Sequence, residues 1–306
     1  MSINIVEKKV KSSDGIHTLV GKVYLPEGEP KAYLHVVHGM EEHIGRYDRF
    51  MRVAAENGYI VFGYDHLGHG LTAQPTGDFG YIADKDGWLR LCQDVEFFSS
   101  AVIAEYGSGL PYYLMGHSMG SFIVRAASEM YVKPDKLIIM GTGGPMALSG
   151  FGLGLVKLNK AVYGGKHCSK FVYLTVFSSY NDHFKSENDT RSWLSSIKEE
   201  RDRNREDEFC RIKFTIGGME DLLRLQRFVN RKAWFSALPN ELPILLVAGS
   251  DDPVGNYGKG VTKVYNLLKQ NGKNAEMKIY QGCRHEILND TCREEVTDDI
   301  LKFLDR

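Results

Sequence analysis

The sequence has no excess of either charge. Its 306 residues include 38 lysines and arginines and 39 aspartates and glutamates, and the basic residues form no long block. The formal net charge of −1 argues against nucleic acid as the main partner. The chain also has only nine prolines, which together with the balanced charge argues against long disordered segments.

Cysteine is scarce as well, and its spacing follows no known pattern. The chain has five cysteines and no C-x-x-C pair. They are Cys92, Cys168, Cys210, Cys283 and Cys292. A chain of this length buries enough surface to fold without disulfides or structural metals. We therefore predict reduced, buried thiols and a reducing compartment.

Long hydrophobic runs are missing too. Residues 1–15 carry charges from Glu7 onward and contain no apolar stretch, which argues against a signal peptide. The uncharged segment 137–156 contains six glycines and Pro145, so we expect no membrane-spanning helix there. These features predict a soluble, cytoplasmic protein.

The segments that are present alternate between strand and helix. Two strand-like segments open the chain, and short apolar runs typical of buried parallel strands follow, separated by helical segments. The expected strands are 3–11, 17–26, 32–37, 59–65, 111–115 and 137–141, and the expected helices are 46–57, 88–106 and 119–132. This α/β alternation predicts a mostly parallel central sheet flanked by helices, with right-handed crossovers.

The alternation stops after Gly141 and resumes about one hundred residues later. The later elements are strands 243–249 and 275–280, and helices over about 258–270 and from about 291. An interruption of this kind is typical of an inserted cap. The expected division is a core of 1–144 and 238–306 with a cap of 145–237.

One segment of the insertion, 198–211, is dense in charge. Eleven of its 14 residues are charged, five of them basic and six acidic. We expect a solvated amphipathic helix held by ion pairs within the helix.

A G-x-S-x-G motif joins one predicted strand to the next predicted helix. It reads Gly116-His117-Ser118-Met119-Gly120. In this context a serine sits on a tight, strained turn that raises its hydroxyl above the sheet. The string alone is weak evidence, and a serine that only caps the helix is the competing interpretation. The position between strand and helix favours a nucleophile.

A serine nucleophile needs a base, and the base needs a carboxylate that orients it. In strand–turn–helix sites of this type the chain order is serine, acid, histidine. His285 is the only histidine after His183 and is therefore the candidate base. Asp251 and Asp252 compete for the role of the acid, and Pro253, which fixes the turn, favours Asp252.

The reaction also needs donors that stabilise a developing oxyanion. The backbone N–H of Met119, directly after the serine, is one candidate. The other is the N–H of Met40, in a loop that reads His38-Gly39-Met40 after the first buried strand. Gly39 would let the backbone turn there.

Two neighbouring segments carry chemically active side chains. The loop Asp65-His66-Leu67-Gly68-His69-Gly70 has possible metal ligands, but one short loop without a partner cluster makes a poor metal site, so we expect a structural turn. Glu41, Glu42 and His43 are expected to hold the oxyanion loop rather than to take part directly in catalysis. We expect no metal ion and no cofactor.

Together these motifs resemble those of the α/β-hydrolase superfamily, and within it the monoacylglycerol lipases and bacterial lysophospholipases. They are HGMEEHIGRYDRF (38–50), YDHLGHGLT (64–72), GHSMGS (116–121), GSDDPVG (249–255) and RHEILND (284–290), with FSSYNDHF (177–184) and CRIKFT (210–215) in the cap. They occur in the expected order and span most of the chain.

The resemblance implies the α/β-hydrolase fold with an inserted helical cap. It also implies a triad and an oxyanion hole; the residues are Ser118, Asp252 and His285, with the amides of Met40 and Met119. One residue departs from the pattern: many relatives read H-G-x-G-E-H, and Glu41 stands at the second glycine position.

The implied activity is that of a serine carboxylester hydrolase that cleaves the fatty acyl ester of single-chain lipids, monoacylglycerol or lysophospholipid. The alternatives are a short-chain carboxylesterase, a serine peptidase of the same fold, and a non-catalytic protein that binds lipid or a partner. The apolar segment 150–156 fits either a place in the core or transient contact with a membrane surface.

Overall fold

The computed structural model describes residues 3–145 and 149–306. The strands are β1 (Asn4–Lys11), β2 (Thr18–Leu25), β3 (Ala32–Val37), β4 (Tyr59–Tyr64), β5 (Tyr112–His117), β6 (Lys136–Met140), β7 (Ile244–Gly249) and β8 (Ala275–Tyr280). The helices are α1 (Asp48–Glu56), α2 (Gly70–Ala73), α3 (Gly87–Tyr106), α4 (Met119–Met130), α5 (Ser149–Tyr163), α6 (Lys170–Phe177), α7 (Lys198–Glu206), α8 (Ile216–Val229), α9 (Lys232–Ala237), α10 (Lys259–Gln270) and α11 (Arg293–Leu304). Most bounds lie within two residues of those expected.

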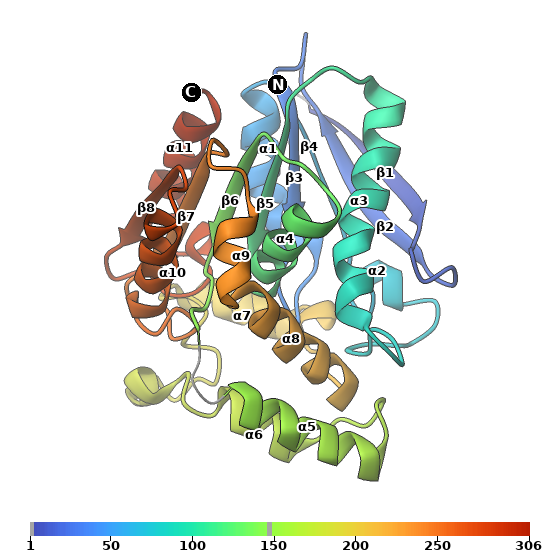
Figure 1. Cartoon of the computed structure of the whole chain (residues 1–306), viewed down its shortest axis with the longest axis vertical. Helices are drawn as coiled ribbons and strands as arrows, with labels where there is room; N and C mark the ends of the chain where they lie inside the picture. The colour runs from blue at the N-terminus through green and yellow to red at the C-terminus, as the bar shows by residue number, and fades with distance from the viewer. Residues whose placement is uncertain (1–2, 146–148) are drawn as a thin grey trace.

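The strands form one sheet of eight, in the order β1-β2-β4-β3-β5-β6-β7-β8 (Figure 1). β1 pairs antiparallel with β2, and β2 antiparallel with β4, whereas every pair from β4 to β8 is parallel. The predicted mostly parallel sheet is therefore confirmed. β5 runs two residues beyond its expected end, because Gly116 and His117 still pair with β3 and β6, so the strand leads directly into Ser118.

Helices cover both faces of the sheet and bury its apolar side chains. Side chains of α3, α4 and α10 pack with one face into a core that also includes α8 and α9. Side chains of α1 and α11 pack with the other face into a second core. β3, β4 and β7 are buried at every position, which explains why they read as continuous apolar runs.

Two glycines of the G-x-S-x-G motif permit a close approach of strand and helix. A Cβ atom at Gly116 would lie 2.3 Å from the carbonyl oxygen of Gly120, and one at Gly120 would lie 2.2 Å from that of Val37. Because both distances are far inside van der Waals contact, only glycine fits at either position. The motif thus fixes how tightly α4 follows β5.

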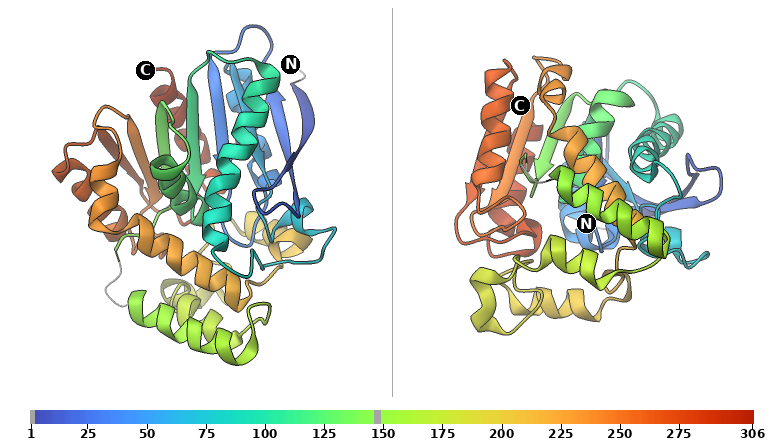
Figure 2. Two further views of the ribbon diagram at one scale, coloured as in Figure 1. Left: turned by 45° about the vertical axis from the view of Figure 1, so that its right-hand side comes forward. Right: turned by 60° about the horizontal axis from the view of Figure 1, so that its bottom comes forward.

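Most of the helices between β6 and β7 lie at one end of the sheet, whereas α9 lies against one of its faces (Figures 1 and 2). These helices differ in which other helices they pack against. α8 packs against α3 and α4, and α9 against α10, whereas α5 packs on α8. α8 therefore lies between α5 and the helices α3 and α4 that cover the sheet.

The charged segment is helical as expected, with α7 at 198–206. Ion pairs within the helix join Lys198 to Asp202 and Arg203 to Glu200. The helix also has a buried face, but the residues on it are the polar Glu200, Arg201 and Asn204 rather than apolar ones. Arg201 is buried because its guanidinium binds Asp189 at 2.9 Å and the carbonyl oxygen of Ser195 at 2.9 Å.

The prediction that all cysteines are reduced thiols is wrong for one pair. Cys283 and Cys292 form a disulfide, with their Cα atoms 6.4 Å apart. The chain turns back between β8 and α11 and brings together two residues that are nine positions apart. Cys92 and Cys210 are buried free thiols as predicted, and Cys168 is an exposed one.

Candidate functional site

Ser118 occupies a strained turn between β5 and α4. Its backbone has φ 53° and ψ −119°, in a region that residues other than glycine rarely adopt. The amide of Ser118 donates to the carbonyl oxygen of Met140 at 3.0 Å, which ties the turn to β6. The side chain makes no capping hydrogen bond to α4, so the interpretation of Ser118 as a helix cap does not fit the structure.

His285 and Asp252 lie together beyond the carboxyl ends of β8 and β7. Nδ1 of His285 is 3.0 Å from Oδ1 of Asp252, and both side chains are buried. The amide of Val254 donates to the same oxygen at 2.8 Å and orients the carboxylate. The carboxylate of Asp251 instead accepts from the hydroxyl of Ser250. Of the two competing acids, Asp252 is therefore the one that binds His285.

The ring of His285 lies next to the nucleophile turn. Its centroid is 4.6 Å from that of His117, the residue before Ser118, and 5.1 Å from that of Trp193 in the insertion. A Cβ atom at Gly141 would lie 3.3 Å from His285 Cε1 and 3.1 Å from His117 Cδ2. In the described part of the chain, no hydrogen bond joins the Ser118 hydroxyl to His285.

The loop after β3 packs directly against Ser118. A Cβ atom at Gly39 would lie 3.0 Å from Cβ of Ser118. Met119 is the first residue of α4, so its amide is one of those at the helix N-terminus that have no partner within the helix. Within residues 3–145 and 149–306, neither the amide of Met40 nor that of Met119 donates a hydrogen bond to the protein.

Glu42 and His117 form a buried pair under these loops. The carboxylate of Glu42 accepts from the amide of Gly39, from the hydroxyl of Tyr47 at 2.8 Å, and from Nδ1 of His117 at 3.2 Å. Nε2 of His117 donates to the carbonyl oxygen of His285 at 3.1 Å. The predicted holding role of Glu42 is confirmed, but its partner His117 was not foreseen.

Each member of this pair shifts the pKa of the other. Burial raises the pKa of Glu42, but the hydrogen bond and charge of His117 outweigh it and lower that pKa to about 2. Burial likewise lowers the pKa of His117, and the hydrogen bond and charge of Glu42 more than reverse this effect. The pair therefore favours a carboxylate and a protonated ring.

Glu41 has a left-handed backbone, with φ 56°. This conformation explains why glycine suits the position in similar sequences. The Glu41 side chain reaches the insertion, where it accepts from the amide of Phe214 at 3.1 Å and from the hydroxyl of Tyr173 at 3.4 Å. Burial raises the pKa of Glu41 to about 7.

The loop from Asp65 to Gly70 is structural, as expected. The carboxylate of Asp65 accepts from the amides of Ile44 at 2.9 Å and Leu71 at 2.7 Å. Nε2 of His69 accepts from the amide of Glu41 at 3.3 Å. These contacts support the loop that carries Met40.

One group of potential metal ligands occurs in the described part of the chain, formed by His43, Asp207 and Cys210. Nε2 of His43 is 2.8 Å from Oδ2 of Asp207. Burial raises the pKa of the Cys210 thiol, and the nearby Arg46 guanidinium does not lower it enough to compensate. A neutral thiol beside a guanidinium is a poor cation ligand, so we assign no metal to the group.

The family comparison matches residues 28–292 to the family Hydrolase_4, described as "Serine aminopeptidase, S33". The matched range includes every site residue described above. Curated relatives are similar over nearly the whole chain. The human "Monoglyceride lipase" is 30% identical over 292 residues, which cover 94% of this chain and 86% of the relative. "Phospholipase YtpA" of Bacillus subtilis is 26% identical over 289 residues, 90% of this chain and 96% of the relative.

Solved structures agree with the fold. A thermostable carboxyl esterase from Bacillus coagulans, in complex with glycerol, superimposes with a TM-score of 0.93 at 29% identity, covering 99% of both chains. A soluble variant of the monoglyceride lipase from Saccharomyces cerevisiae gives a TM-score of 0.77 at 19% identity, covering 100% of this chain and 96% of that one. The second likeness supports the α/β-hydrolase fold alone.

We expect Glu41→Gln to become more stable relative to the wild type as pH rises from about 5 to about 8. Because burial raises the pKa of Glu41 to about 7, the native protein holds this proton where the unfolded chain has lost it. The free energy of unfolding of the wild type therefore falls across that range, and glutamine removes this effect. Denaturant unfolding at several pH values measures the difference.

The exposed Glu27, changed to Gln, is the control and should show a difference between variant and wild type that does not depend on pH. An equally flat difference for Glu41→Gln would contradict the assignment of a buried, proton-binding carboxylate.

Proposed function

Since the chain belongs to the hydrolase family described as serine aminopeptidase, S33, we propose that it is a serine carboxylester hydrolase that cleaves fatty acyl esters of single-chain lipids. The observation that carries the proposal is the buried pair of His285 and Asp252 beside the strained turn at Ser118. These are the base, the orienting acid and the nucleophile that ester hydrolysis through an acyl-enzyme requires.

In the proposed mechanism, Ser118 turns its hydroxyl toward Nε2 of His285 and loses its proton to that nitrogen as it attacks the ester carbonyl carbon. The tetrahedral oxyanion accepts hydrogen bonds from the amides of Met40 and Met119. His285 then protonates the leaving alcohol, and the same nitrogen activates the water that releases the fatty acid from Ser118. Asp252 keeps Nδ1 protonated throughout.

A row of aromatic rings supports a long acyl chain as the substrate. It runs from Tyr173 in α6 through Phe177 and Tyr180 to Trp193 and ends at His285, with successive centroids 4.8, 5.3, 5.1 and 5.1 Å apart. Each methylene group of an acyl chain that packs against these rings would contribute about 0.8 kcal/mol to binding. The human and Mycolicibacterium smegmatis relatives named for monoglyceride or monoacylglycerol cleavage support the same substrate class.

The alternative function is a short-chain carboxylesterase; the Bacillus coagulans carboxyl esterase supports ester hydrolysis without indicating the chain length. A serine peptidase of the same fold is a further alternative, suggested by the family description. In either case Ser118, Asp252 and His285 would keep their roles. A non-catalytic protein that binds lipid would need no such pair.

We expect Ser118→Ala to abolish ester hydrolysis and Asp252→Asn to lower kcat by about 10⁴, while the fold is retained. The carboxamide at position 252 no longer fixes the tautomer of His285. Asp251→Asn is the matched control, one residue away and bound to Ser250 instead of His285, and should keep activity close to that of the wild type.

Hydrolysis of a chromogenic ester and covalent labelling by a fluorophosphonate measure these effects. Wild-type turnover in Ser118→Ala would refute the nucleophile, and equal losses in the two aspartate variants would refute the assignment of Asp252.

The acyl chain can be tested on a series of p-nitrophenyl esters, from acetate to palmitate, together with monoacylglycerol and lysophosphatidylcholine. We expect kcat/KM to rise with chain length, since each methylene group adds binding energy along the aromatic row. Trp193→Ala should flatten the rise. If kcat/KM is instead highest for acyl chains of roughly two to four carbons, which are too short to contact the whole aromatic row, the result would favour the short-chain carboxylesterase.

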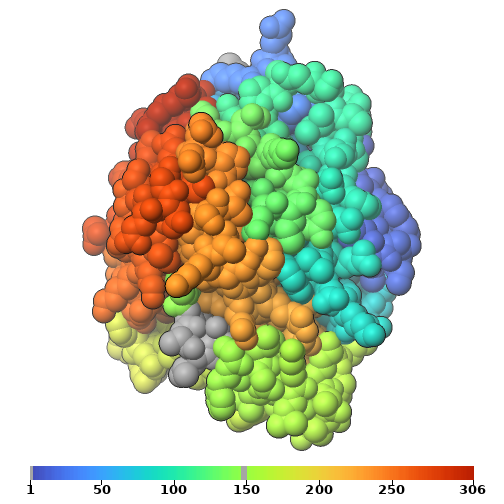
Figure 3. Space-filling model, in the orientation of Figure 1, coloured from blue at the N-terminus to red at the C-terminus, as the bar shows by residue number. Residues whose placement is uncertain are grey.

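An apolar surface on α5 and α6 supports contact with a lipid surface. Its residues are exposed by between 46% and 74% of their area: Phe151, Leu158, Val162, Tyr163, Phe171 and Leu174. Within 150–156, Leu153 and Val156 are buried whereas Phe151 is exposed, so the segment serves both the core and the surface. Figure 3 shows the yellow-green segment that contains α5 and α6 at the bottom of the molecule. Within the described residues, none of the helices is both long enough and apolar enough to cross a membrane.

We propose that this surface, defined by the six residues above, docks on lipid aggregates from which the substrate is taken. The double variant Phe151→Ser/Leu158→Ser should lose several-fold activity on long-chain monoacylglycerol in phosphatidylcholine vesicles but keep its activity on soluble p-nitrophenyl butyrate. Ile16→Ser is the control, because Ile16 is 73% exposed and lies between β1 and β2, outside the proposed docking surface. Equal losses on both substrates would contradict docking.

A further inference from the structure

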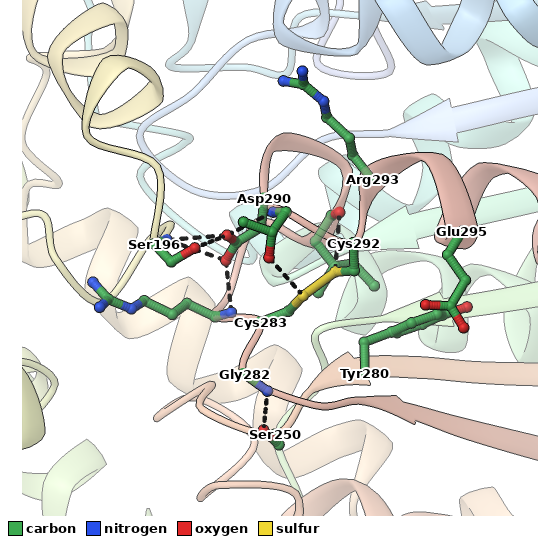
Figure 4. The surroundings of a disulfide bond; sticks show 12 residues. Ser196, Ser250, Tyr280, Gly282, Cys283, Asp290, Cys292, Arg293 and Glu295 are labelled. Carbon is green, nitrogen blue, oxygen red and sulfur yellow. Dashed lines mark hydrogen bonds between the residues drawn. A yellow bond between two sulfur atoms is a disulfide. The ribbon is translucent and has the colours of Figure 1, made fainter.

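The disulfide between Cys283 and Cys292 closes the loop that carries His285 (Figure 4). Cys283 lies just after β8, and Cys292 precedes the first residue of α11. The loop between them also carries Glu286, whose carboxylate binds the buried guanidinium of Arg46. The covalent bond therefore spans the segment that presents the proposed base.

Cys283 stands between the proposed acid and the proposed base. Its carbonyl oxygen accepts from the amide of Asp251 at 3.0 Å, next to Asp252. A Cβ atom at Gly249 would lie 2.0 Å from the same carbonyl oxygen, so the end of β7 packs tightly against this residue. His285 follows two residues later. A shift of the backbone at Cys283 would thus act on both members of the pair.

The rest of the loop is held only by non-covalent contacts. The carboxylate of Asp290 accepts from the amides of Arg284 at 2.8 Å and Ser196 at 3.1 Å. The amide of Glu286 donates to the carbonyl oxygen of Leu194 at 2.7 Å. Without the disulfide, the loop would be held by these hydrogen bonds and by the ion pair of Glu286 with Arg46, none of which is covalent.

The two sulfur atoms differ in access. Cys283 is 1% exposed, whereas Cys292 is partly exposed and follows Thr291, an exposed residue. Of the two cysteines, the more exposed Cys292 is therefore the one that we expect a small thiol to attack. None of the other three cysteines in the described residues is paired, and only Cys168 among them is exposed.

We propose that Cys283 and Cys292 form a thiol–disulfide exchange site whose oxidised state holds His285 in its reactive position, and whose exchange partner is a small thiol such as glutathione. The inference rests on the proposed role of His285. It makes the pair a modification site through which the thiol–disulfide balance of the surroundings sets the hydrolytic rate.

The exchange takes two balanced steps. A thiolate attacks Sγ of Cys292, the bond between the cysteines breaks, and the sulfur of Cys283 leaves as a thiolate that takes up a proton. A second small thiolate attacks the small-molecule sulfur of the mixed disulfide, the bond from that sulfur to Sγ of Cys292 breaks, and Cys292 leaves as a thiolate that takes up a proton while the oxidised small disulfide is released. The protein gains two thiols, and two small thiols are oxidised to one disulfide. The oxidised state returns by the reverse steps with glutathione disulfide.

The test compares the full-length protein equilibrated with glutathione disulfide and with reduced glutathione. The thiols are counted in Cys168→Ser, because glutathione disulfide would also react with the exposed thiol of Cys168. Titration after denaturation should find two free thiols in the first state and all four in the second. The rate of fluorophosphonate labelling should fall about threefold or more on reduction, and the unfolding temperature by about 4 °C.

Cys283→Ser/Cys292→Ser should behave as the reduced wild type in both buffers. Cys292→Ser alone also removes the disulfide and changes only the more exposed residue. It replaces the double variant in the test if that variant does not fold. Cys168→Ser, which removes the exposed thiol, is the matched control and should keep the full response to glutathione.

Four free thiols in Cys168→Ser treated with glutathione disulfide would overturn the proposal, and so would labelling rates that do not differ between the two states. If no form of the protein is labelled, the proposed hydrolase function fails. In that case the thiol count and the difference in unfolding temperature still decide whether the exchange site exists.

Discussion

The carboxylate of Glu42 binds groups from separate parts of the chain, and the arrangement of the candidate site depends on it. It accepts hydrogen bonds from the amide of Gly39, the hydroxyl of Tyr47 and the ring of His117, which in turn donates to the carbonyl oxygen of His285. Glu42 and His117 are almost fully buried, where an unpaired charge costs several kcal/mol. The ionic pair of Glu42 and His117 therefore joins the loop after β3, the nucleophile turn and the histidine loop at one point.

Local sequence patterns predict the sheet and the nucleophile turn well, because both depend on neighbours in the chain. Continuous apolar runs occur where β3, β4 and β7 are buried on both faces. Gly116 and Gly120 are required by contacts within a few residues and with β3. The choice between Asp251 and Asp252 depended on the local turn at Pro253, and the structure brings Asp252 to His285.

The residues that sequence patterns missed act through distant partners. His117 is separated from Glu42 by 75 positions, and a histidine beside a serine nucleophile gives no local sign of an ionic partner. The ion pairs of Arg201 with Asp189 similarly bury part of a helix whose charge density predicts solvent exposure. Cys283 and Cys292 meet because the chain reverses between β8 and α11, which neither their spacing nor their neighbours reveals.

Two parts of the insertion differ in what they contact. One part is bound to the histidine loop and the core helices, and the other rests on α8. Residues 192–196 are bound to the histidine loop: the guanidinium of Arg284 donates to the carbonyl oxygen of Ser192 at 2.6 Å, and Asp290 accepts from the amide of Ser196. α8 is packed on α3 and α4. In contrast, α5 and α6 rest on α8 and expose apolar side chains. Displacing residues 192–196 would therefore disturb the proposed base, whereas displacing α5 and α6 would break the hydrogen bond of Tyr173 with Glu41 and leave the histidine loop in place. The aromatic row begins in α6 and ends at His285, so ring contacts connect the part of the insertion that rests on α8 with the part bound to the histidine loop.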